Sequence, residues 1–70
     1  MPMKLTVADL KSLKALLRYA RELIDDAANT SRAADDTARH IRLRSLSRQV
    51  DDELDSLAQS LAAAERAAKS

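Results

Sequence analysis

Residues 10–27 read LKSLKALLRYARELIDDA. Apolar residues recur in this stretch every three or four positions, at Leu10, Leu13, Leu17, Ala20, Ile24 and Ala27. This spacing follows one face of an α-helix, which turns by about 100° per residue. Just upstream, Thr6 and Asp9 have the spacing of a capping box, and Leu5 and Leu10 that of a hydrophobic staple. The pattern predicts a first helix over about residues 7–28.

A second run with the same period follows a polar segment. Its apolar positions are Leu43, Val50, Leu54, Leu57, Leu61, Ala64 and Ala68, and Ser47 stands where one more apolar residue would fit. The polar run Asn29-Thr30-Ser31 interrupts the helical pattern, because such side chains compete for backbone hydrogen bonds. We expect a turn over about residues 29–36 and a second helix over about 37–67. Its N-cap remains open among Asn29, Thr30, Ser31 and Asp36.

The charges decide between a hairpin and one long bent helix. Residues 39–48 hold four arginines and no acid, whereas residues 51–55 hold four acids and no base. Folding the chain back sets Glu22, Asp25 and Asp26 beside the arginines and brings residues 51–55 towards Lys11 and Lys14. Both juxtapositions pair opposite charges. The sequence therefore predicts an all-α fold, an antiparallel two-helix hairpin that forms one domain over residues 1–70.

The composition excludes broad classes of chemistry. The chain has no Gly, Cys, Trp or Phe and a single Pro, which favours helix over sheet. It therefore lacks a thiol nucleophile and a glycine-rich phosphate loop, and its one histidine cannot form a multi-histidine metal site. The acidic run at residues 51–55 is interpreted as a solvated face. We expect no enzymatic activity, no cofactor, no metal, no membrane segment and a cytoplasmic location.

The apolar stripe is wider than one partner helix needs. Leu16 and Leu23 lie to one side of the main stripe of the first helix, with Tyr19 beyond them, and Leu46 widens the second stripe. A chain this short buries a modest fraction of its surface and has no disulfide or zinc site to compensate. We expect Leu16, Tyr19, Leu23 and Leu46 to form the seam of a homodimer, a four-helix bundle.

Residues 39–48 are the candidate partner-binding segment. On a helical wheel Arg44 and Arg48 fall near the outer face, and Ile41 projects away from the apolar stripe. Apolar and arginine side chains anchor many protein interfaces. We therefore assign partner binding to Ile41, Arg44, Arg48, Arg42 and His40. The alternative is that the second helix begins later and Ile41 covers the end of the hairpin.

Two other functions compete with protein binding. Lys11, Lys14, Arg18 and Arg21 form a basic ridge on the first helix, which predicts contacts to the phosphates of an RNA. Tyr19 is the one aromatic residue, so the chain has no stacking platform for single-stranded nucleic acid. The third possibility is a structural or chaperone-like subunit whose apolar stripe is completed by a different chain.

The first helix carries a resemblance. The run Asp9-Leu10-Lys11, Leu13, Leu17-Arg18, Ala20 and Glu22, followed by a polar turn and an Ala/Leu-rich second helix, resembles small phage-encoded quorum-sensing anti-activators. This resemblance implies a dimeric helical hairpin that binds a LuxR-type regulator and the type IV pilus assembly ATPase. Size and architecture are also similar to plasmid copy-number regulators that bind paired RNA loops. The resulting expectation is a phage or mobile-element inhibitor that binds a host regulatory protein.

Overall fold

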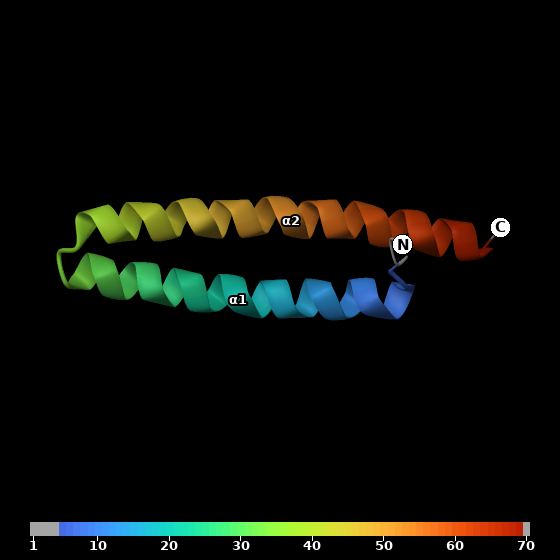
Figure 1. The fold of residues 1–70 in the computed structure, drawn as a ribbon, viewed down its shortest axis with the longest axis horizontal. Coiled ribbons are helices and arrows are strands. Elements are labelled where there is room, and N and C mark those ends of the chain that lie inside the picture. Colours follow the sequence, from blue (N-terminus) through green and yellow to red (C-terminus); the bar gives the residue numbers. More distant parts are fainter. Residues whose placement is uncertain (1–4, 70) are drawn as a thin grey trace.

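The computed structural model describes residues 5–69, which form an antiparallel hairpin of two α-helices. Helix α1 spans Val7–Ala33 and helix α2 spans Thr37–Lys69. The helices lie side by side along the whole of α1, and α2 extends further at the open end (Figure 1). The molecule is accordingly a rod of 53 × 22 × 14 Å. The expected all-α hairpin is confirmed.

Helix α1 begins at the expected capping box. The Thr6 hydroxyl accepts from the backbone N–H of Asp9 at 3.1 Å, and the Asp9 carboxylate accepts from the backbone N–H of Thr6 at 3.1 Å. The hydrogen bond from the Thr6 backbone, with a smaller contribution from the Thr6 side chain, lowers the pKa of the Asp9 carboxyl below its ordinary value. Leu10, one turn after Thr6, is buried.

Helix α1 does not end near residue 28, where the polar run indicated a break. It continues through Asn29-Thr30-Ser31 to Ala33. The Thr30 hydroxyl donates to the carbonyl oxygen of Asp26 at 2.9 Å, four residues back along the same helix. This hydroxyl therefore bonds within the helix and does not compete for the next turn. The turn is correspondingly shorter than the expected 29–36.

Three residues, Ala34, Asp35 and Asp36, connect the helices. The N–H of Asp35 donates to the Arg32 carbonyl at 3.1 Å and the N–H of Asp36 to the Ser31 carbonyl at 2.8 Å, the pattern of a Schellman motif. Asp35 takes the left-handed conformation with φ of 60°, a place where glycine is usual and Asp is tolerated. Asp36 is the N-cap of α2, because its carboxylate accepts from the backbone N–H of Arg39 at 3.2 Å.

The seam between the helices contains mostly Leu and Ala. Its buried members are Leu10, Ala28 and Ser47, and the other seam leucines are half-buried. Ala27, expected in the stripe, is exposed, whereas Ala28 is completely buried. Ala28 lies four residues after Ile24, about one turn of the helix, and therefore faces α2. It can do so because α1 continues past residue 28.

Candidate protein-binding surfaces

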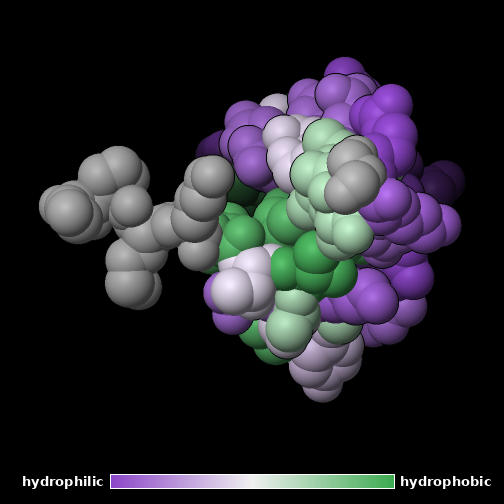
Figure 2. All heavy atoms as spheres, turned by 90° about the vertical axis from the view of Figure 1, so that its right-hand side faces the viewer, coloured by the Kyte–Doolittle hydropathy of each residue, from purple (hydrophilic) through white to green (hydrophobic). Residues whose placement is uncertain are grey.

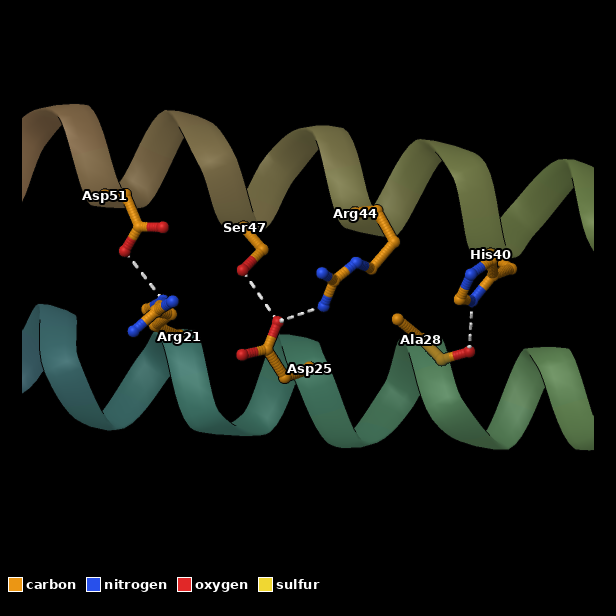
Figure 3. Close-up of polar contacts among 7 residues, drawn as sticks. All are labelled: Arg21, Asp25, Ala28, His40, Arg44, Ser47 and Asp51. Atoms are coloured by element: carbon orange, nitrogen blue, oxygen red, sulfur yellow. Dashed lines mark hydrogen bonds and ion pairs between the residues drawn. The ribbon is translucent and has the colours of Figure 1, made fainter.

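The seam near the turn contains polar contacts among its apolar residues. The Ser47 hydroxyl donates to Oδ1 of Asp25 at 2.7 Å, and Nη1 of Arg44 donates to the same oxygen at 3.4 Å (Figure 3). Ser47 is only 5% exposed, so its hydroxyl needs a partner within the protein. Asp25 supplies that partner, which explains how a hydroxyl occupies an apolar position of the stripe.

A second ion pair crosses the seam one turn away. Nε of Arg21 lies 2.7 Å from Oδ1 of Asp51 (Figure 3). The predicted juxtaposition of Asp25 with the arginine block is confirmed by its pair with Arg44. Asp51, expected near Lys11 and Lys14, pairs with Arg21 instead. Together the two pairs fix the alignment of the helices along their length.

His40, assigned to partner binding, is a hairpin contact. Its Nδ1 lies 2.8 Å from the carbonyl oxygen of Ala28, and its ring is half-buried against α1 (Figure 3). Because a carbonyl oxygen only accepts, Nδ1 carries the proton and donates. His40 therefore faces the seam and its Nδ1 is engaged by α1, and its role in partner binding stays a prediction.

The remaining residues of the partner-binding segment divide between two sides of α2. Because α2 begins at Thr37, the alternative placing Ile41 over the hairpin end is wrong, and its side chain is 61% exposed. Arg48 lies on the same stripe seven residues on, and Arg42 lies about 100° around the helix from Ile41. Arg44 lies between Ile41 and Arg48 but turns towards Asp25. We call the exposed pair Ile41 and Arg48 the Ile41 flank.

Most of the exposed large hydrophobic side chains gather on the other side of the hairpin. Leu16 is 65% exposed, and Tyr19, Leu23 and Leu46 are also exposed, as expected for residues outside the hairpin seam. Leu16 and Leu23 lie roughly 140–180° around α1 from the ion-paired residues Arg21 and Asp25, and Leu46 lies roughly 140–160° around α2 from Arg44 and Asp51. We call Leu16, Leu23 and Leu46, with Tyr19 at the outer edge, the apolar face.

Seen from its open end, the molecule has two unlike sides (Figure 2). Hydrophobic surface continues from the middle of the molecule to one side, whereas the other side is almost entirely hydrophilic (Figure 2). The ion pairs Arg21–Asp51 and Arg44–Asp25 bridge the helices on one side only. Each helix is amphipathic, and the hairpin that they form also has one hydrophobic and one hydrophilic side.

The basic ridge is less continuous than the sequence indicated. Lys11 and Arg18 are exposed, but Lys14 is half-buried and Arg21 is paired with Asp51. The sequence placed all four side chains on the solvent side because the helical angle alone does not show how far a long side chain reaches across the seam. Asp51 places a negative charge at one end of this ridge.

Within residues 5–69 no pocket is found, and no three His, Cys, Asp or Glu side chains converge as a metal site would require. In the same part of the chain neither helix has a stretch apolar and long enough to span a bilayer. No protein family matches the sequence, and no curated protein or solved structure is similar to the chain.

Proposed function

We propose that this chain is a small non-enzymatic protein-binding module, an inhibitor or anti-activator of a phage or mobile element that binds a host regulatory protein. The observation that carries the proposal is the placement of exposed hydrophobic side chains: an apolar face with Leu16, Leu23 and Leu46, and Ile41 apart from it, about 140° around α2 from Leu46. Exposed apolar residues gathered on one face mark sites of protein association. A LuxR-type regulator, the partner implied by the resemblance, is the first candidate partner to test. Binding to such a regulator would locate the protein in the cytoplasm.

The two surfaces suit two tasks. The apolar face would be buried between copies of the chain in a four-helix bundle, and the Ile41 flank would contact the regulator. Ile41 supplies an apolar side chain and Arg48 a cation two turns further along the same stripe, and arginine is enriched among the residues that dominate binding energy. Arg44 takes part indirectly, because its pair with Asp25 holds α2 in register.

The test is the double variant Ile41→Ala with Arg48→Ala, titrated against a purified LuxR-type regulator. Binding should weaken by about 2 kcal/mol, roughly 30-fold, if these side chains anchor the interface. The free energy of unfolding should change by less than about 0.5 kcal/mol, because both positions are exposed. Gln59→Ala with Glu65→Ala, two exposed positions further along α2 that belong to neither surface, is the matched control. Equal affinities of the two double variants would refute the assignment.

The same titration separates the competing functions. An RNA-binding bundle would lose affinity steeply with added salt and would be disabled by Lys11→Ala with Arg18→Ala, while the Ile41 variant would still bind. A structural subunit completed by another chain would be poorly folded when purified alone. Circular dichroism of the isolated protein detects that outcome directly.

A further inference from the structure

We infer that a second copy of this chain covers the apolar face, so that the Ile41 flanks of the two copies point away from each other. The dimer itself follows from the described surface. The role of the two outward flanks rests on the proposed function.

The apolar face is continuous across both helices. The contacts Arg21–Asp51 and Ser47–Asp25 fix the register. With a rise of about 1.5 Å per residue, this register places Leu23 within one turn of Leu46, and Leu16 beside the half-buried Leu57. Hydrophobic side chains from both helices therefore form one strip along the same side of the hairpin.

The exposed area has the magnitude that a dimer would remove. The chain exposes 5656 Å². A folded monomer of 7.7 kDa exposes about 4,300 Å² on average. The excess of about 1,300 Å² reflects the elongated shape of the hairpin, and a rod of this length has a side large enough for the about 800 Å² that each partner of a standard interface buries. No large side chain among residues 5–69 is completely buried, so the hairpin alone has almost no interior.

The charges favour a second copy over a charged partner. The ion pairs and the basic ridge lie away from the apolar face, and the charged residues beside Leu46 on α2, Arg42 four residues before it and Glu53 seven residues after it, have opposite signs. A formal net charge of +1 leaves little repulsion between two copies. A face of this kind is complementary to itself, as a two-fold interface requires.

The helical angles then fix where the Ile41 flank lies in the dimer. Ile41 is five residues before Leu46, which places the two side chains about 140° apart around α2. When Leu46 faces the second copy, Ile41 faces outward. The dimer therefore presents two identical Ile41 flanks on opposite sides and has room for two partner molecules.

Sedimentation equilibrium of the full chain at micromolar concentration tests the inference. The wild-type protein should sediment at twice 7.7 kDa, and its Tm should rise with protein concentration. Leu16→Glu should sediment as a monomer or lose its helicity, because a carboxylate would enter an apolar seam. Ile41→Glu introduces the same charge at a similarly exposed position, 61% against 65%, and should remain a dimer.

Each outcome decides one proposal separately. A monomeric wild-type protein with a concentration-independent Tm would overturn the dimer, as would an Ile41→Glu variant that dissociates while Leu16→Glu does not. Neither result depends on the regulator. Conversely, an Ile41→Glu variant that stays dimeric and binds the regulator with wild-type affinity would overturn the proposed function and leave the dimer intact.

Discussion

The two halves of the hairpin seam are built differently. Near the turn, the helices meet through Ser47–Asp25, Arg44–Asp25 and the contact of His40 with Ala28. Near the open end they meet through leucines, Leu10, Leu13 and Leu17 from α1 and Leu54, Leu57 and Leu61 from α2. Leucines pack in several alignments, whereas hydrogen bonds of fixed geometry satisfy only one. The comparison teaches that both halves bury side chains, Ala28 near the turn and Leu10 near the open end, whereas hydrogen bonds and ion pairs that select one register occur in the turn half.

The largest expected effect comes from the open half. Leu10→Ala should lower the free energy of unfolding by about 2–4 kcal/mol, because it removes apolar contacts from a residue that is only 6% exposed. Urea denaturation followed by circular dichroism measures the change. Gln59→Ala, at an exposed position of α2, should stay within about 0.5 kcal/mol. Similar values for both variants would show that the leucine half does not supply the burial.

The turn half should respond less, but in a coupled way. Asp25→Ala leaves the buried Ser47 hydroxyl without its acceptor and should cost about 1–2 kcal/mol. Adding Ser47→Ala removes the orphaned hydroxyl and should recover part of that loss. A double-mutant cycle from the same denaturation curves gives the coupling energy. Strictly additive effects would mean that the pair does not define the register.

The smallest effect concerns the open end of α1 and depends on pH. Folding lowers the pKa of Asp9, so its carboxylate stabilises the folded state above the ordinary value of 3.8. That stabilisation is lost as the pH falls through the lowered pKa. The Tm of the wild-type protein should therefore decrease below about pH 4 more than that of Asp9→Asn. Parallel Tm curves for the two proteins would show that the capping box contributes nothing through its charge.

Most of the fold could be predicted because its determinants are local. The spacing of leucines and the Thr6–Asp9 capping box indicated α1, and the alternating charge blocks indicated the antiparallel arrangement. The turn was predicted less well. Nothing in the sequence shows that the Thr30 hydroxyl bonds backwards to Asp26, and Asp35 adopts a left-handed conformation without the glycine that usually signals it.

The candidate surfaces could be predicted where exposure depends on the helical angle alone. Leu16, Tyr19, Leu23 and Leu46 lie outside the hairpin seam as expected. His40 and Arg44 both reach the opposite helix, and of these contacts the charges predicted only the pair of Arg44 with Asp25. Long side chains rotate about several bonds, so their contacts depend on which acceptor the second helix presents. Ser47, a hydroxyl at an apolar position of the second stripe, and Asp25, next to Ile24 of the first stripe, were the available signal.

The short connection between the helices also has a consequence for the order of folding. The His40–Ala28 contact closes a separation of 12 residues and Ser47–Asp25 one of 22, whereas Leu10 meets a part of α2 much further along the chain. Short loops close with a smaller loss of entropy. We therefore expect assembly to start at the turn and proceed to the open end. Folding kinetics should give φ-values closer to one for Ser47→Ala than for Leu10→Ala, and the reverse order would refute this sequence of events. The contacts that specify the alignment would then form before the leucines pack, so that the chain is aligned before it collapses.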